Sequence, residues 1–313
     1  MDPPQISVVV PCLNEVENVA PLTEAIKAEL AKSDVVSYEI LFIDNGSTDG
    51  TIELVKDLCT VDPAVRLIVN NRNYGQKRSP TYGIYQASGA AVISLCADFQ
   101  DPPQMIGAFI ERWRTGVKIV LGKRAFEKMS PGMRLFRAMG YGFLARFGDH
   151  PVLPDVTGFG LYDRAVVDCL KQWRDPEPFF RGMLVESGFS LETIPFDRPE
   201  RAAGRSKNSV FAMIDFGLSG VASASTQLLR APLYLSPFVF AAAGLALLIG
   251  IGLIIVGRGS WTPFLLALVG GCFGVNLVFL GLIGEQVGLI AKTVRGAPLV
   301  VEKERVNFPA SSQ

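Results

Sequence analysis

Residues 38–59 read YEILFIDNGSTDGTIELVKDLC. The first six are apolar apart from Glu39 and predict a β-strand, the next eight are polar turn formers, and apolar residues then recur at helical spacing. Polar and acidic side chains therefore stand directly after the carboxyl end of a strand. In open sheets of parallel strands, ligands bind outside that edge, so this stretch predicts both the fold and the place of the chemistry.

The same alternation runs through the first 125 residues. Apolar runs predict strands at 6–10, 38–43, 65–69, 91–95 and 117–121, and helical patterns lie near 18–31, 49–59, 76–87 and 103–115. This order predicts an α/β fold with a mostly parallel sheet covered on both faces. The groups just past the strand ends are 11–15, 44–49, 70–75 and 96–101, and they are polar and acidic.

The overall composition excludes several classes of protein. Thirty Lys and Arg balance thirty Asp and Glu, which argues against a nucleic-acid binder that works by neutralising phosphates. A single histidine, His150, excludes a multi-histidine site and is expected to be a loop residue. Five cysteines without a CxxC pair favour reduced thiols over a disulfide framework. The amino terminus does not resemble a signal peptide.

The apolar residues are concentrated near the carboxyl terminus. Residues 231–284 contain one charged residue, Arg258, and each half is long enough for a helix to cross the hydrocarbon core of a bilayer. We expect a two-helix transmembrane hairpin over 231–288, with spans at about 233–257 and 262–285. Two buried helices of a soluble core are the alternative. Basic residues at 292, 295, 303 and 305 place both ends on the cytoplasmic side.

Residues 208–230 precede the hairpin and carry few charges. Phe211, Ile214, Leu218 and Val221 recur at helical spacing, which predicts a juxtamembrane amphipathic helix; a plain core helix explains the pattern equally well. The expected organisation is a catalytic domain over 1–207, this helix over 208–230, the hairpin, and a cytoplasmic tail over 289–313.

No glycine loop that could grip phosphates follows the first strand, where a dinucleotide-binding fold carries one. Gly158 and Gly160 lack a third glycine and are interpreted as a turn. Carboxylates at the strand ends instead suggest phosphates held through a hard divalent cation such as Mg²⁺ or Mn²⁺. This argues against a nucleotide-dependent oxidoreductase.

Three segments together resemble the family 2 glycosyltransferases of the GT-A fold, in the branch that acts on polyprenyl phosphates. They are VVPCLNE at 9–15, IDNGSTDGT at 43–51 and ADFQDPP at 97–103. Shorter matches are GKR at 122–124, DVTGF at 155–159, FRG at 180–182 and RAAGRSK at 201–207. The resemblance covers nearly the whole chain and implies a GT-A domain with a carboxyl-terminal membrane hairpin.

For the nucleotide-sugar donor, the resemblance implies contacts from Pro11, Leu13, Glu15, Asp44 and Asn45. A carboxylate can accept a hydrogen bond from a base N–H or a ribose hydroxyl. Asp44 has an alternative role as a turn-forming residue before Gly46. Asn45 stands where the family often has a second aspartate.

The metal-binding motif departs from the family pattern. The family usually has Asp-Ala-Asp-Leu-Gln, whereas this chain has Cys96 at the first position and keeps Asp98 and Gln100. Asp98 and Gln100 are the expected metal ligands, for Mg²⁺ or Mn²⁺, and Asp98 also faces the donor. Cys96 is expected to be a small apolar neighbour, because thiolates suit Mg²⁺ poorly. A helix cap before Pro102 is the alternative role for Asp98, although Asp101 suits such a cap better.

For the acceptor, the resemblance implies that Arg201, Ser206 and Lys207 bind the phosphate of a polyprenyl lipid, with Arg124 at the departing diphosphate and Asp155 near the acceptor. The basic stretch at 201–207 could instead attract anionic lipid. A phosphate monoester is largely dianionic at pH 7 and needs no histidine base. Asp98, Arg124 and Asp155 are therefore the candidate catalytic residues for transfer with inversion.

The expected function is transfer of one sugar, UDP-glucose being the first donor to try, to a polyprenyl phosphate at the cytoplasmic face of a bacterial plasma membrane. The sugar itself stays open. A homo-oligomer is plausible from hairpin packing, and nucleic acid is not an expected partner. One alternative is a non-catalytic membrane protein that kept the fold and lost its metal site at Cys96. A processive synthase is disfavoured, since Gln172-Trp173-Arg174 has the wrong order for its motif.

Overall fold

The computed structural model describes residues 4–125, 153, 155–173, 175–199 and 262–308, with isolated positions between 238 and 256. These residues fall into two compact units. One contains the described residues of 4–199 together with residues 296–308, and the other contains the described residues between 238 and 295.

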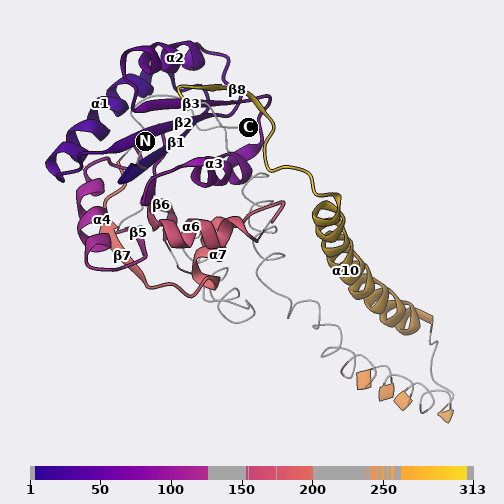
Figure 1. Ribbon diagram of the computed structural model, residues 1–313. Helices are drawn as coiled ribbons and strands as arrows, with labels where there is room; N and C mark the ends of the chain where they lie inside the picture. The colour runs from indigo at the N-terminus through magenta and orange to yellow at the C-terminus, as the bar shows by residue number, and fades with distance from the viewer. Residues whose placement is uncertain are drawn as a thin grey trace. The chain divides into compact units, whose positions relative to one another are not determined.

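The first unit is built on an eight-stranded sheet with the order β7-β5-β6-β4-β1-β2-β3-β8 (Figure 1). The strands are β1 (Ile6–Cys12), β2 (Tyr38–Asp44), β3 (Val65–Asn70), β4 (Ala91–Ser94), β5 (Ile119–Arg124), β6 (Val156–Asp163), β7 (Leu191–Phe196) and β8 (Glu302–Val306). β6 and β8 run antiparallel to their neighbours, and the remaining pairs are parallel. The predicted α/β fold with a mostly parallel sheet is confirmed.

Helices connect the strands and cover both faces of the sheet. They are α1 (Val16–Lys32), α2 (Thr51–Val61), α3 (Gly75–Gln86), α4 (Met105–Arg114), α6 (Arg164–Lys171) and α7 (Phe180–Glu186). α1, α2 and α4 contribute to one apolar cluster, and α3, α6 and α7 contribute to the other. The four helices and five strands expected in the first 125 residues are all present, with ends shifted by a few residues.

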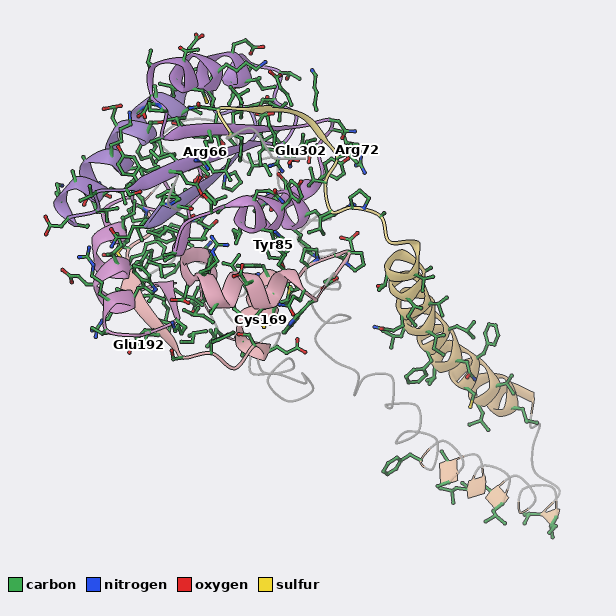
Figure 2. All side chains as sticks on the ribbon, viewed as in Figure 1. Arg66, Arg72, Tyr85, Cys169, Glu192 and Glu302 are labelled. Carbon is green, nitrogen blue, oxygen red and sulfur yellow. The ribbon has the colours of Figure 1, made fainter. Side chains whose placement is uncertain are left out.

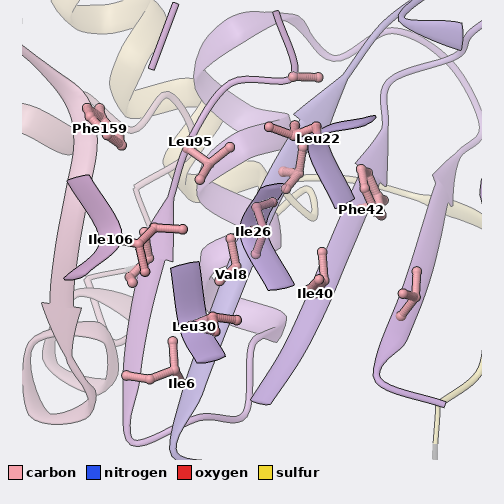
Figure 3. Packing of buried hydrophobic residues seen from close by; sticks show 14 of the residues in the cluster. Ile6, Val8, Leu22, Ile26, Leu30, Ile40, Phe42, Leu95, Ile106 and Phe159 are labelled. Atoms are coloured by element: carbon pink, nitrogen blue, oxygen red, sulfur yellow. The ribbon is translucent and has the colours of Figure 1, made fainter. Parts of the chain in front are cut away.

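Side-chain alternation along the central strands builds these two clusters. In β1, Val8 and Val10 join the cluster under α1, whereas Val9 joins the opposite one. Successive residues of a strand point to opposite faces, so an unbroken apolar run is needed where both faces are covered. Figure 3 shows Val8 beside Ile26 and Ile40 in the first cluster. The rigid sheet fixes the positions of the loops at its edge.

Gly158 and Gly160 lie within β6, which corrects their interpretation as a turn. A Cβ atom at Gly160 would stand 2.3 Å from the carbonyl oxygen of Val120 on β5. Glycine at this position is therefore required by close packing of two strand backbones, a long-range cause that the local sequence does not display.

The carboxyl-terminal residues return to the sheet. β8 pairs antiparallel with β3, with Glu302 opposite Asn70, although residues 289–313 were expected to form a separate tail. Figure 2 labels Glu302 on β8 and Arg72, which follows the end of β3. The strand is rich in charge, as is common at sheet edges, and so it lacks the apolar alternation that would have predicted it.

In the second unit, α10 runs from Thr262 to Arg295. Many of its apolar side chains are exposed, including Phe273, Leu280 and Ile290. Within the part of the chain that the structure describes, no helix is both long enough and apolar enough to cross a membrane. The described helices thus give no support to the spans expected at about 233–257 and 262–285. The predicted helix over 208–230 lies outside the described residues.

Candidate functional site

The loops after β1 and β2 are joined at the carboxyl edge of the sheet. The backbone N–H of Asn14 donates to Oγ of Ser47 at 2.8 Å, and the N–H of Thr48 donates to Oδ1 of Asn14 at 2.8 Å. Asn14 adopts a left-handed backbone with φ of 58°, which asparagine tolerates better than most residues. This reciprocal pair fixes the two loops that carry most of the expected donor contacts.

Pro11 lies near the end of β1, Leu13 and Glu15 lie in the loop that follows, and all three are partly exposed. The N–H of Glu15 donates to Oγ1 of Thr51 at 2.9 Å, and its carboxylate accepts from the side chain of Asn18 at 2.6 Å. The structure therefore brings these three residues beside the loop after β2. Their contacts with a donor remain predictions.

Asp44 is completely buried at the end of β2. Its Oδ1 accepts hydrogen bonds from the N–H groups of Gly46 and Ser47, both at 2.9 Å. The carboxylate thus orders the turn, which is the alternative role that the sequence offered for it. A contact between Asp44 and the nucleotide stays a prediction.

Asn45 is the centre of a network of amides. Its Oδ1 accepts from Nδ2 of Asn70 at 3.2 Å and from the N–H of Tyr74 at 2.8 Å. Its Nδ2 donates to Oδ1 of Asn73 at 2.9 Å and to the carbonyl of Gly75 at 3.2 Å. All the hydrogen-bonding capacity of this amide is therefore used on the end of β3, the loop that follows it and the start of α3. Its expected role toward the donor remains untested.

The turn at 96–101 follows β4 and carries the expected metal ligands. Phe99 adopts a left-handed backbone with φ of 59°, a strained conformation that is typical of functional sites. Oδ1 of Asp98 accepts from the N–H of Gln100 at 3.1 Å, and Oδ2 of Asp101 accepts from the N–H of Cys96 at 3.0 Å. Both carboxylates are buried within this turn.

Neither carboxylate of this turn caps the following helix. The residue before α4 is Gln104, and no side chain caps that helix end. The suggestion that Asp101 acts as a cap is therefore wrong. Asp101 instead accepts a hydrogen bond from the N–H of Cys96 at the start of the turn. This bond closes the turn and so helps to fix the position of Asp98.

Cys96 stands where the usual motif has its first aspartate. Its residue surface is exposed, yet desolvation by the surrounding protein and the nearby Asp101 and Asp98 carboxylates raise the pKa of its thiol well above the ordinary value. A neutral thiol is a poor ligand for a hard cation. Among the described residues, no group of three or more His, Cys, Asp and Glu side chains could hold a metal ion.

The remaining oxygens fit a cation that is shared with a substrate. Asp98 supplies a carboxylate and Gln100 an amide oxygen within the same turn. Mg²⁺ commonly takes one or two protein carboxylates and completes its shell with substrate phosphates and water. The residues present are therefore compatible with Mg²⁺ or Mn²⁺ bound together with a diphosphate.

Arg198 is a site residue that the sequence analysis missed. It lies just after β7, and its Nη2 donates to Oε1 of Gln100 across 98 positions of the chain. No local pattern marks this arginine, because its role depends on the placement of β7 relative to the turn after β4.

Arg124 and Asp155 are neighbours in the structure. The N–H of Arg124, the last residue of β5, donates to the carbonyl of Asp155 at 3.0 Å. Arg124 also pairs in register with Phe196 at the end of β7. The strand pairing thus connects two of the candidate catalytic residues with the segment that carries Arg198. Arg201, Ser206 and Lys207 lie outside the described residues, as does His150.

Comparisons with known proteins agree with this arrangement. Residues 7–171 match the model of the family described as glycosyl transferase family 2. The chain is 30% identical to the uncharacterized glycosyltransferase YkcC of Bacillus subtilis, over 95% of this chain and 93% of the relative. It is 31% identical to a prophage-derived bactoprenol glucosyl transferase of Shigella flexneri, over 96% of this chain and 98% of the relative.

Among solved structures, glucosyl-3-phosphoglycerate synthase from Mycobacterium tuberculosis is similar in fold. That structure, a complex with Mn²⁺, UDP-glucose and phosphoglyceric acid, gives a TM-score of 0.51 at 16% identity and covers 70% of this chain and 78% of the synthase. At this identity the likeness concerns the fold alone. The family match extends from β1 to α6 and includes the turns at 44–49 and 96–101. The chain therefore belongs to glycosyl transferase family 2.

Proposed function

We propose that this glycosyltransferase moves one sugar from a nucleotide-sugar donor, with UDP-glucose as the first candidate, to the phosphate of a polyprenyl phosphate. The observation that carries this proposal is the similarity to bactoprenol glucosyl transferases along nearly the whole chain. The similarity includes the carboxyl-terminal half, which the family model does not cover. Similarity limited to residues 7–171, which the family model matches, would not indicate which acceptor the enzyme uses.

The donor would lie at the carboxyl edge of the sheet, against the loops after β1, β2 and β4. Asp98 and Gln100 would hold a divalent cation together with the donor diphosphate. Such a cation, when bound, supplies Lewis-acid stabilisation of the departing phosphate charge. Arg124 would add a fixed positive charge at the end of β5, which suits a group on which negative charge develops.

The acceptor requires little activation. A phosphate monoester oxygen attacks the anomeric carbon from the face opposite the diphosphate, the new carbon–oxygen bond forms, and the bond to the nucleoside diphosphate breaks with inversion. Because the attacking oxygen is already anionic near pH 7, no general base has to remove a proton. Arg201, Ser206 and Lys207 are proposed to bind this phosphate through charge-assisted hydrogen bonds, with Asp155 near it.

A lipid acceptor calls for attachment to a membrane. We propose that the nearly uncharged segment 231–284 provides it, as a hairpin whose ends lie with the catalytic domain on the cytoplasmic side of a bacterial plasma membrane. Exposed apolar side chains on α10, such as Phe273 and Leu280, are consistent with a lipid environment. Packing between copies of this segment would also permit a homo-oligomer.

One observation favours a second candidate function. Cys96 replaces an acidic metal ligand and its thiol is neutral in the ordinary pH range, so the chain could be a membrane partner that kept the fold without turnover. Metal-dependent transfer of sugar by the purified protein would exclude this candidate.

The test is transfer of labelled sugar into organic-extractable lipid. Detergent-purified protein would be incubated with a polyprenyl phosphate, Mn²⁺ or Mg²⁺, and a panel of labelled UDP- and GDP-sugars. Label from one donor, lost on addition of EDTA, would establish the reaction and identify the sugar. Absence of transfer from every donor, beside an active relative as a control, would contradict the proposal.

A further inference from the structure

Arg198 brings a positive charge to the turn that holds the expected metal ligands. Its guanidinium donates to the side-chain oxygen of Gln100. Burial raises the pKa of the Cys96 thiol and of the Asp101 carboxyl, and the charge of Arg198 acts on both in the opposite direction with a smaller effect. The guanidinium therefore lies within electrostatic reach of three residues in the turn at 96–101.

The same side chain retains an unused donor. Nε of Arg198 is buried, and among the described residues no acceptor lies within hydrogen-bonding distance of it. A buried N–H without an acceptor costs free energy, and one at a functional site points to an acceptor supplied by a ligand. The planar guanidinium group has five donors arranged to match phosphate oxygens.

We infer that Arg198 binds the diphosphate of the nucleotide-sugar donor and shares with the metal the task of neutralising it. This inference rests on the proposed function, because it places a nucleotide diphosphate at the turn that carries Asp98. Arg198 can contribute in this way because β7 ends beside β5, and so it approaches the turn from the side of Arg124. With Cys96 in place of an aspartate the metal site has one carboxylate fewer, and the positive charge of Arg198 makes diphosphate binding less dependent on the metal.

The contact with Gln100 has a second consequence. A cation bound to Oε1 of Gln100 would stand next to the guanidinium that donates to the same oxygen, and like charges at that distance repel. Arg198 therefore weakens metal binding in the absence of donor, while it strengthens binding of the diphosphate. Removal of the side chain should change the two affinities in opposite directions, which a merely structural role would not do.

The experiment measures binding by calorimetry on the detergent-purified full-length protein and does not depend on turnover. We expect Arg198→Ala to weaken the binding of UDP in EDTA about tenfold or more, which corresponds to the loss of one charge-assisted contact. Binding of Mn²⁺ without nucleotide should tighten in the same variant. Arg198→Lys keeps the charge and loses the planar group. Its affinity for UDP should therefore lie between that of the wild type and that of Arg198→Ala.

The control is Arg112→Ala. Arg112 is an exposed arginine on α4, and its Nε lies 3.8 Å from Oε2 of Glu192. It should leave both affinities unchanged. Equal UDP binding by the wild type and by both Arg198 variants, with unchanged melting temperatures, would overturn the inference. If the wild type itself binds no UDP and no other nucleoside diphosphate, the proposed function fails instead.

Discussion

The side-chain amide of Asn45 donates to the side-chain oxygen of Asn73 at 2.9 Å. The same nitrogen also donates to the carbonyl of Gly75 at 3.2 Å. An aspartate at this position would have no hydrogen to give to either acceptor. The side-chain amide at position 45 thus supplies the two hydrogens that Asn73 and Gly75 accept.

Asn45→Asp should therefore destabilise the protein. The carboxylate would lose two donated hydrogen bonds and face two oxygen atoms in a buried position, at a cost of about 1–3 kcal/mol. The thermal unfolding midpoint should fall by roughly 2–4 °C for each kcal/mol. Asn71→Asp is the control, because its oxygen accepts from the hydroxyl of Tyr74 and a carboxylate can do the same. Equal midpoints for both variants would refute this role of the Asn45 amide.

Asp98→Ala should abolish sugar transfer and leave the fold intact. Asp98 is the proposed carboxylate ligand of the metal, and Cys96 leaves no second one in the motif. The loss should therefore exceed about a hundredfold, as for other groups that stabilise charge in the transition state. Label transfer into lipid and the unfolding midpoint are the two measurements. Asp168→Asn, at an exposed position of α6, is the control. Turnover of Asp98→Ala near the wild-type rate would exclude the metal assignment.

Gly160→Ala should destabilise the sheet by about 2–3 kcal/mol, because the new methyl group overlaps the carbonyl oxygen of Val120 and comes within 3.0 Å of Cα and of a side-chain methyl group of Leu121. Gly158→Ala is a matched control two residues away on β6, where no heavy atom of the described residues other than its chain neighbours lies within 4 Å of the added Cβ. Its effect should remain within about 0.5 kcal/mol. Chemical denaturation of both variants checks the difference, and similar losses for both would contradict the crowding argument.

Asn307 connects the end of β8 to the region between α2 and β3. Its Nδ2 lies 2.7 Å from the carbonyl of Val65, 3.2 Å from that of Asp62 and 3.3 Å from that of Cys59. Asn307→Asp removes the donor, keeps the size of the side chain and should cost about 1–3 kcal/mol. Hydrogen exchange of the amides in β8 should accelerate.

The control for this variant is Lys303→Ala, since Lys303 is exposed on the same strand. It should leave the exchange of β8 unchanged. If the amides of β8 exchange as slowly in both variants as in the wild type, Asn307 does not hold the strand in place.

Asp163 should make stability depend on pH in the acid range. Burial alone would raise the pKa of its carboxyl, but hydrogen bonds from Trp113, from the N–H of Ala165 and from Lys118 outweigh burial and lower it. The stabilisation is therefore fully present above the unfolded pKa, near 3.9, and is lost as the pH falls through the lower folded value. Asp163→Asn should be less stable than the wild type by about 1–2 kcal/mol at pH 7.

The difference between wild type and Asp163→Asn should shrink below about pH 4, because the carboxyl of the unfolded wild type takes up its proton there and that of the folded protein does so only at lower pH. Denaturant titrations at several pH values measure this directly. A difference that is the same at pH 3 and at pH 7 would show that the charge of Asp163 contributes nothing.

The local sequence predicted the part of the fold that is encoded by periodicity. Short and mainly apolar runs such as 6–10 and 38–43 are typical of strands covered on both faces. The polar groups after them gather at one edge because parallel strands point the same way. The motif at 96–101 could likewise be located from its residues, since its turn is held by short-range bonds from Asp98 and Asp101.

Other features depended on contacts between distant parts of the chain. β8 pairs with β3 from more than 200 positions away, and Arg198 reaches Gln100 only because β7 lies beside β5. Asn45 illustrates the same limit at closer range. The family resemblance suggested a donor contact for it, whereas its four partners come from the end of β3, the loop that follows and the start of α3. The periodicity of a segment and the chemistry of its side chains are local properties, and they can be read from the sequence. The partner of a buried polar group depends on the tertiary structure, because a desolvated group must form its hydrogen bond with whatever the fold brings within reach.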